Sequence, residues 1–528
     1  MWLEGYCFAA GMGAVLIFLP ALGIWSEIRQ GSGKSAGSAG ASSGQKSIQK
    51  NGIRLNKNAY SVNDAGACRS ARMEIKMKKY NMLKDSPGKS LFFFALPMIL
   101  GNLFQQFYNM ADSVIVGQCV GEDALAAVGA SYSLTTVFIM IAIGGGIGAS
   151  VITSQYLGAK EYDRMKTSVY TALLTFAAVS VLLGIFGFLM CGRILTALRT
   201  PQNILPDAVL YLRIYFVGLP FLFMYNILSS VFNALGNSKT PLYLLIFSSV
   251  LNVGLDFLMV LAFHMGVAGV AVATVTAQGL SAVISFLLLM KALRSYGERK
   301  EKGEVSYYST EMLGGMVKIA IPSMLQQSIV SIGMLLVQSV VNGFGSSVLA
   351  GYTSGIRIES ICIVPMIATG NAVSTFTAQN LGAGSAERVK KGYRSAYGIV
   401  LGFGIVIFAV LSVFHRQIIA AFIEEGSGAA SFAIGDSYLE FMRFFFVFIG
   451  LKAITDGVLR GAGDVGVFTL SNLINLGIRV FVSFRFASIW GVEAVWYAVP
   501  MGWIANYVIS FIWYLTGKWS RKRIIRVE

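Results

Sequence analysis

Charged residues are scarce in this chain of 528 residues, since Asp, Glu, Lys and Arg together make up 13% of it while hydrophobic residues make up 55%. Soluble domains carry about 25% charged residues. The shortage, together with a mean hydropathy of +0.66, excludes an ordinary soluble domain and indicates an integral membrane protein embedded in the lipid bilayer. The formal net charge of +16 does not indicate a nucleic-acid partner, because the basic residues lie between apolar runs and at the chain ends.

Residues that bind transition metals are also scarce. Only two histidines, His264 and His415, are present, and the five cysteines show no CxxC or other metal-ligand spacing. Because transition-metal sites depend on His and Cys ligands, the sequence predicts no metal centre and no cofactor. It also lacks the His/Asp constellation or surface acid cluster that a membrane-embedded enzyme would need, so we predict that the protein is not an enzyme.

Apolar runs follow one another from residue 91 onward, and each is long enough to cross a bilayer as a helix. We therefore predict an all-α integral membrane fold of twelve transmembrane helices. Because this number is even, both ends of the twelve-helix core lie on the same side of the membrane. The predicted spans are 91–117, 126–156, 168–190, 208–234, 241–263, 267–292, 313–342, 348–378, 393–414, 435–459, 466–488 and 493–516.

Basic residues gather in the loops on one side of the predicted membrane. Only Arg193, Arg199 and Arg416 fall on the other side. By the positive-inside rule the basic side is cytoplasmic, which predicts a multi-pass protein of the bacterial plasma membrane with both ends of its core in the cytoplasm. The basic set comprises Lys76, Lys78, Lys79, Lys84, Lys160, Arg164, Lys166, Lys239, Lys291, Arg294, Arg299, Lys300, Lys302, Lys318, Arg388, Lys390, Lys391, Arg394, Arg460 and the tail KWSRKRIIR.

The first part of the chain differs in composition from the rest. Residues 7–25 are apolar, and residues 31–44 (GSGKSAGSAGASSG) read as a Gly/Ser linker. A signal peptide needs a basic start, whereas the only early charge here is Glu4. An additional span at 7–25 is one alternative, but we favour a later translation start and expect residues 1–84 to be a poorly ordered extension. The candidate start residues are Met73, Met77 and Met82.

An internal repeat organises the remainder. The segment QYLGAKEYDRMK (155–166) reappears as QNLGAGSAERVK (379–390), a shift of 224 residues, and FNALGN (232–237) pairs with LRGAGD (459–464). Six spans in each half keep the two copies in the same orientation, so their pseudo-twofold axis runs along the membrane normal. Parallel repeats with a site at their interface are a transporter architecture.

The repeat sets the predicted domain organisation. We expect an N-terminal six-helix bundle at 85–292 and a C-terminal six-helix bundle at 313–517, with a cytoplasmic linker at 293–312 between them and a basic tail at 518–528. A receptor or structural role would need a large extramembrane domain, which this organisation does not provide.

Two acids are unusual within the first-half spans. Asp112 and Asp256 are the only carboxylates there that lie well away from both helix ends, and Asn252 lies four residues before Asp256 on the same helix face. Two acids in one low-dielectric cavity repel each other, which favours retention of a proton by one of them. With oxygen donors from Asn252 and a hydroxyl, the pair can instead hold a hard cation such as sodium. A packing role for each acid is the alternative, although intramembrane acids are rarely structural.

Several segments of the chain resemble the multidrug and toxic compound extrusion (MATE) family. The likeness runs in uninterrupted order from residue 85 to residue 517, and it implies a MATE-like fold of two pseudo-symmetric six-helix bundles. It also implies efflux of small amphipathic organic cations, coupled to the entry of sodium ions or protons. The segments are ADSVIVGQCVGEDALAAVGAS (111–131), TSQYLGA (153–159), ALGNSKTPLY (234–243), NVGLDF (252–257) and AQNLGAG (378–384).

The resemblance also implies site residues. In MATE proteins with a first-lobe cation site, an acid on the first helix meets an Asn and an Asp four residues apart on the fifth helix and a Thr on the sixth. The matching positions are Asp112, Asn252, Asp256 and Thr274, and Tyr211 matches a fourth-helix tyrosine beside that site. We also predict a substrate cavity from the polar residues Gln105, Gln106, Asn109, Gln326 and Gln327.

The second half departs from this pattern, because Arg479 stands in the place of Asp256. This weakens any prediction of a second cation site. We expect the remaining charges of that half to compensate one another, Arg357 with Glu359, and Lys452 with Asp456 and Arg460.

A lipid-linked oligosaccharide flippase of the same broad superfamily is the alternative function. It would need a cavity rich in Arg and Lys to bind diphosphate, and the first-half spans hold none centrally. We favour a cation-coupled multidrug antiporter that acts as a monomer. The sequence leaves open the substrate spectrum and the choice between sodium and protons.

Overall fold

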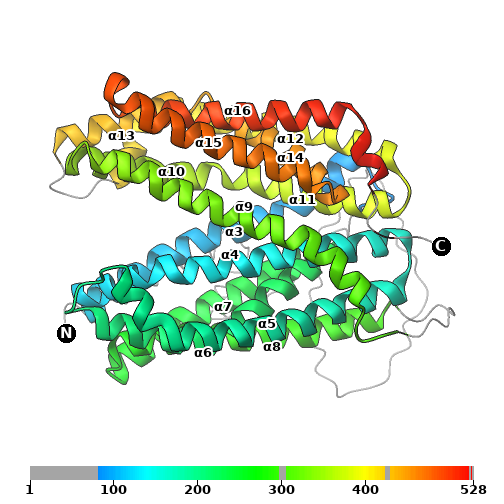
Figure 1. Ribbon diagram of the computed structural model, residues 1–528, viewed down its shortest axis with the longest axis horizontal. Helices are drawn as coiled ribbons and strands as arrows, with labels where there is room; N and C mark the ends of the chain where they lie inside the picture. The colour runs from blue at the N-terminus through cyan, green and yellow to red at the C-terminus, as the bar shows by residue number, and fades with distance from the viewer. Residues whose placement is uncertain (1–80, 297–304, 423–427, 523–524, 526–528) are drawn as a thin grey trace, which may run out of the picture. The chain divides into compact units, whose positions relative to one another are not determined.

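The computed structural model describes residues 81–296, 305–422, 428–522 and 525. These residues form helices joined by short loops, and they contain no β-strand (Figure 1). The first half comprises α3 (Pro87–Ile115), η2 (Val116–Val120), α4 (Glu122–Ala159), α5 (Tyr162–Ala197), α6 (Leu205–Ala234), α7 (Lys239–Phe257), η3 (Leu258–Ala262) and α8 (Gly266–Arg294). The second half comprises α9 (Thr310–Asn342), α10 (Ser346–Cys362), α11 (Val364–Gly382), α12 (Ala386–Phe422), α13 (Ala429–Met442), α14 (Phe446–Ala462), α15 (Val465–Trp490), α16 (Glu493–Leu515) and η4 (Lys518–Arg521).

The predicted all-α membrane fold is confirmed. Among the described residues, 11 helices are long and apolar enough to cross a membrane, with α10 and α11 together counting as the single span Ser346–Gly382. The remaining predicted span, 435–459, is a helix pair, because residues 443–445 separate α13 from α14 and leave each too short to span alone. Most helices extend beyond the predicted apolar runs, because polar residues at their ends continue the helix toward the membrane surfaces.

Two helices, α3 and α9, each contact both halves of the chain. The helix α3 packs against α7 of its own half and against α11 and α12 of the other half. In the equivalent way, α9 packs against α15 of its own half and against α4 and α5 of the first half (Figure 1). The first helix of each repeat therefore contributes to the connection between the two halves.

The repeated QxLGA motifs lie where α4 crosses α11. A side chain at Gly158 would overlap the backbone carbonyl of Gln379, and a side chain at Gly382 would overlap the backbone carbonyl of Gln155. The glutamines of the two motifs also occupy equivalent positions, since Gln155 Nε2 donates to the carbonyl of Gly461 (3.3 Å) and Gln379 Nε2 donates to the carbonyl of Ala234 (2.7 Å). The repeat is thus a packing motif that meets its own copy across the pseudo-twofold axis.

The glycine cluster of α4 serves close packing as well. A side chain at Gly144 or Gly148 would collide with α9, one at Gly145 with Phe176 of α5, and one at Gly146 with Ser230 of α6. Without side chains at these positions, α4 approaches three neighbouring helices closely.

Of the predicted extension, only residues 81–84 lie among the described residues. There Met82 is buried, and its carbonyl accepts hydrogen bonds from Asn380 Nδ2 (3.3 Å) and from Arg388 Nη2 (3.0 Å). The chain just before α3 is therefore anchored to the second half. The predictions for the apolar stretch and the Gly/Ser linker concern residues outside the described ranges.

We predict that Gly158→Ala and Gly382→Ala each destabilise the protein, because the new methyl group forces the crossing of α4 and α11 apart. Overpacking of this kind costs about 1–3 kcal/mol. The measurement is the melting temperature of the purified protein in detergent. Gly398→Ala and Gly402→Ala on α12 are matched controls, since a side chain there meets nothing within 4 Å. A melting temperature for Gly158→Ala equal to those of the controls would contradict the packing role.

Candidate functional site

The predicted first-half site is assembled from four helices. Asp112 lies on α3, Tyr211 on α6, Asn252 and Asp256 on α7, and Thr274 on α8. Asn252 and Asp256 are one helical turn apart and are both buried, with 2% and 0% of their surface exposed. Their burial deep in an apolar helix means that each polar atom needs a partner within the protein.

Asn252 lies at the centre of the site. Its side-chain amide is 3.3 Å from the hydroxyl of Thr274. When the amide nitrogen faces α3, it donates to Tyr108 Oη (2.8 Å) and to Asp256 Oδ2 (3.0 Å), while the amide oxygen accepts from the backbone nitrogen of Thr274 (3.1 Å). This orientation satisfies every neighbour and is the one we adopt. Asn252 therefore links α3, α7 and α8.

The carboxyl groups of Asp112 and Asp256 lie within side-chain hydrogen-bonding distance of each other. Oδ1 of each is buried and lacks a hydrogen-bond donor. Neither carboxyl group forms an ion pair with a Lys, Arg or His of the described ranges. Two such acids can lie together only if a proton or a cation offsets their charge. The structure thus brings together the two acids that the sequence singled out.

Two tyrosines lie close enough to the acid pair to interact with it electrostatically. Tyr211, which the resemblance indicated, interacts with both Asp112 and Asp256. Tyr108 interacts with the same two acids and forms a side-chain hydrogen bond with Thr274, but sequence reasoning missed it. The spacing contained the signal, because Tyr108 lies four residues before Asp112 on the same face of α3.

An acidic cavity of about 390 Å³ lies at the end of the first half where α3 meets α4 and α7 meets α8. Glu122, Asp123, Asp207 and His264 contribute to its lining. Val120, Ala124 and Val267 line the cavity and also belong to a small apolar cluster with Val116 and Val260. Val116 and Val260 lie one turn beyond Asp112 and Asp256, so this valine layer lies between the cavity and the acid pair.

The residues predicted to line a substrate cavity lie on α3 and α9, the first helices of the two repeats. On α3, Gln105 Nε2 donates to Asn109 Oδ1 (3.3 Å). On α9, Gln326 donates to Asn472 Oδ1 (3.4 Å), and Gln327 lies 3.5 Å from the sulfur of Met140. Gln106 is partly buried on α3. These contacts do not join the two sets into one site, and a substrate role for them stays a prediction.

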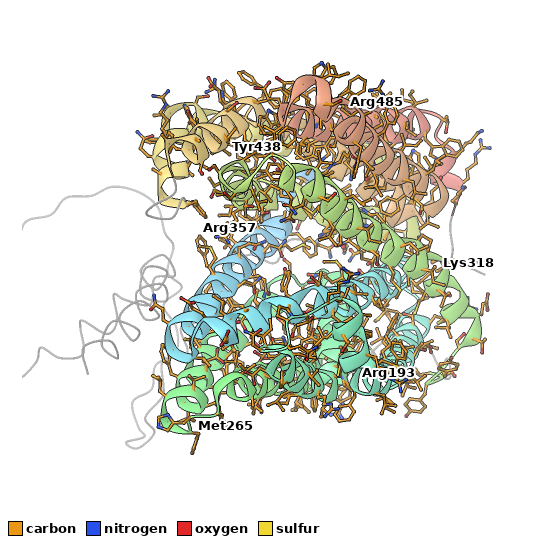
Figure 2. The ribbon with its side chains drawn as sticks, turned by 60° about the vertical axis from the view of Figure 1, so that its left-hand side comes forward. Arg193, Met265, Lys318, Arg357, Tyr438 and Arg485 are labelled. Atoms are coloured by element: carbon orange, nitrogen blue, oxygen red, sulfur yellow. The ribbon has the colours of Figure 1, made fainter. Side chains whose placement is uncertain are left out.

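The second half contains an acid–base network in the place of the acid pair. Glu359 of α10 is buried, accepts a hydrogen bond from Tyr438 and lies near Arg479. The expected pairing of Glu359 with Arg357 is wrong, because residues two apart point to opposite faces of a helix. Figure 2 shows Tyr438 and Arg357 among the second-half helices, whereas Met265 and Arg193 belong to the first half.

The other expected pair of the second half is confirmed. Lys452 Nζ is 3.2 Å from Asp456 Oδ2, one turn away on α14. Asp456 also accepts hydrogen bonds from Asn472 Nδ2 (3.2 Å) and Ser510 Oγ (3.0 Å). Arg460 also interacts electrostatically with Asp456, and it donates to Asn371 Oδ1 (2.6 Å). Asp456 is therefore fully paired, in contrast to the acids of the first half.

A duplicated all-helical membrane bundle with a buried acid pair is typical of membrane transporters. The sequence model of the MatE family matches residues 97–258 and 322–484, one match in each half. The probable multidrug resistance protein YpnP of Bacillus subtilis is 30% identical over 451 residues, which cover 85% of this chain and 99% of YpnP. The multidrug export protein MepA of Staphylococcus aureus is 22% identical over 343 residues, which cover 64% of this chain and 74% of MepA.

Solved structures show the same fold. A MOP superfamily transporter from Pyrococcus furiosus superposes with a TM-score of 0.77 at 22% identity, covering 83% of this chain and 98% of that one. A variant of the Vibrio cholerae MATE transporter VcmN superposes with a TM-score of 0.75 at 22% identity, covering 82% of this chain and 97% of that one. The chain belongs to the MatE family; it is a multi-pass membrane transporter of the multidrug efflux type and not an enzyme.

We predict that Tyr108→Phe lowers both the melting temperature and the rate of export. The change removes the hydroxyl that accepts from Asn252 and leaves a buried amide without its partner, which costs about 1–3 kcal/mol. Fluorescent-drug efflux from cells and thermal unfolding in detergent measure the two effects. Tyr132→Phe on α4, where the side chain is 65% exposed, is the matched control. Wild-type melting temperature and export rate in Tyr108→Phe, as in the control Tyr132→Phe, would contradict the role of Tyr108 in the site.

Proposed function

We propose that the protein is a secondary active antiporter that exports amphipathic organic cations in exchange for protons or sodium ions. The observation that carries this proposal is the contact between Asp112 and Asp256 without a basic partner among the described residues. A pair of this kind binds and releases a cation or proton, and its charge differs between the two states. That difference can bias the equilibrium between two conformations of the helices that carry the acids.

The orientation of the Asn252 amide favours a proton over a sodium ion at the acid pair in this conformation. The amide nitrogen, not the oxygen, faces Asp256, so Asn252 stabilises a carboxylate while the two acids share one proton. A sodium ion would be held by the carboxyl oxygens of Asp112 and Asp256 and the hydroxyl of Thr274, donors that suit a hard cation. The proposal therefore includes both ions and expects them to compete for one site.

The distribution of charge supports an orientation in the plasma membrane. The QxLGA crossing and the loops rich in Lys and Arg lie at the same helix ends, which we propose face the cytoplasm. The acidic cavity lies at the opposite helix ends. We propose that cations collect there from outside, attracted by Glu122, Asp123 and Asp207, and reach the acid pair through the valine layer. We expect the protein to function as a monomer in this orientation.

The names of the relatives support drug efflux rather than lipid flipping. YpnP and MepA are both described as multidrug proteins. A flippase for a lipid-linked diphosphate would need cationic side chains at its central site, whereas the first-half site contains two acids and no cation. The acid pair is thus better suited to a coupling ion than to an anionic lipid headgroup.

We predict that Asp112→Asn reduces gradient-driven export more than about tenfold, because the amide keeps the shape of the side chain but cannot carry the coupling charge. Ethidium transport into everted vesicles, driven by an imposed proton or sodium gradient, measures the effect. Asp163→Asn, at the start of α5 and away from the site, should transport like the wild type. Wild-type rates in Asp112→Asn, at normal expression, would show that the acid is structural.

A further inference from the structure

One arginine binds the short segment before α3 to the second half. Arg388, near the start of α12, donates from Nε (3.2 Å) and from Nη2 (3.0 Å) to the carbonyl oxygen of Met82, and it also donates to the carbonyl oxygen of Asp85. Asn380 Nδ2 donates to the same Met82 oxygen (3.3 Å). The guanidinium lies over the ring of Phe376, 5.7 Å from its centroid. The arginine therefore joins α11, α12 and the chain before α3.

The segment held in this way is itself ordered by hydrogen bonds. The backbone nitrogen of Asn81 donates to Asp85 Oδ2 (2.7 Å), and the nitrogen of Leu83 donates to Asn81 Oδ1 (2.8 Å). Met82 is 4% exposed and belongs to the apolar core that α11 and α12 form with the start of α3. Because this turn leads into α3 at Pro87, the helix begins from a fixed point on the second half.

Farther along its length, α3 is attached to the first half. Ser238, at the start of α7, donates from Oγ to the carbonyl oxygen of Phe94 (2.8 Å), and Asp112 contacts Asp256 in the acid pair. Asp112 lies 25 residues after Pro87, about 38 Å along the helix at about 1.5 Å per residue. One continuous helix is thus fixed at its start to one half and near its end to the other.

The internal repeat shows that the equivalent arginine of the first half has a different partner. Arg164 corresponds to Arg388 after the shift of 224 residues, and its Nε lies 3.5 Å from Oε2 of Glu161. Ser385 stands at the position of Glu161 in the second copy, so the equivalent ion pair cannot form there. The second copy instead uses its arginine to bind the carbonyl groups before α3.

We propose that Arg388 is a positioning residue for antiport, which keeps the start of α3 on the second half so that a change of charge at the acid pair moves the two halves relative to each other. This inference rests on the proposed function, since it assumes that Asp112 and Asp256 bind the coupling ion. Hydrogen bonds from a charged donor are stronger than neutral ones, which suits them to hold a moving helix. Without them, ion binding shifts α3 and leaves the second half behind. Arg388 therefore controls the rate of rearrangement and not the affinity for ion or drug.

The test separates turnover from binding, with ethidium transport into everted vesicles and with proton release from the purified protein into weakly buffered solution. We expect Arg388→Gln to lower kcat about tenfold and to change KM less than about twofold, because charge-assisted hydrogen bonds are lost at a distance from both sites. Proton release on addition of ethidium should stay at the wild-type level. Arg388→Lys keeps the charge without the guanidinium fork and should lower kcat only about threefold. Arg394→Gln, at an exposed arginine of the same helix, is the matched control and should behave like the wild type.

The melting temperature of each purified variant checks its folding. If Arg388→Gln fails to fold, Arg388→Lys decides the question, because a lower kcat at an unchanged KM supports the proposal and a wild-type kcat overturns it. Wild-type turnover in Arg388→Gln would overturn it as well, and so would a loss of proton release or a changed KM in that variant, since Arg388 would then shape the sites themselves. A wild-type protein that neither exports ethidium nor releases protons would instead count against the proposed function.

Discussion

The two halves of the transporter depend on a contact in which backbone meets backbone. Gly158 of α4 lies against the carbonyl of Gln379, and Gly382 of α11 lies against the carbonyl of Gln155. In lipid there is little hydrophobic gain from joining two apolar helices, so association relies on close packing and hydrogen bonds. The QxLGA copies supply both, because each glutamine also bonds to the end of a helix in the opposite half, at Gly461 and at Ala234.

This crossing determines what the other helices can do. With α4 and α11 held together at the ends near the basic loops, α3 and α9 each pass from one half to the other. The helix that carries Asp112 therefore contacts the second half near Gly88 and the first-half site near Tyr108. In the antiport mechanism that we propose, a change of charge at the acid pair acts on a helix that contacts both halves, and this would link ion binding to rearrangement.

Most of the fold could be predicted from the sequence, because membrane spans and an internal repeat are encoded in hydropathy and in short motifs. The spacing of Asn252 and Asp256 predicted their shared helix face, and the family resemblance added Thr274 and Tyr211. The sequence could not predict that α3 and α9 contact both halves, since hydropathy places a helix in the membrane but does not identify the helices that it packs against. Tyr108 was missed because it is one of 22 tyrosines in the chain and no motif distinguishes it from the others. The predicted pairing of Arg357 with Glu359 was wrong because residues two apart lie on opposite faces of a helix.

The central claim is that Asp112 and Asp256 together hold the ion that drives export. The most direct measurement is the number of protons that the purified protein releases into weakly buffered detergent solution when ethidium or sodium is added. The account predicts that the wild type releases up to about one proton per molecule, as expected for two coupled acids that share a proton, and that Asp256→Asn releases none. Release from Asp256→Asn equal to that from the wild type, or no release from the wild type with either cation, would contradict it.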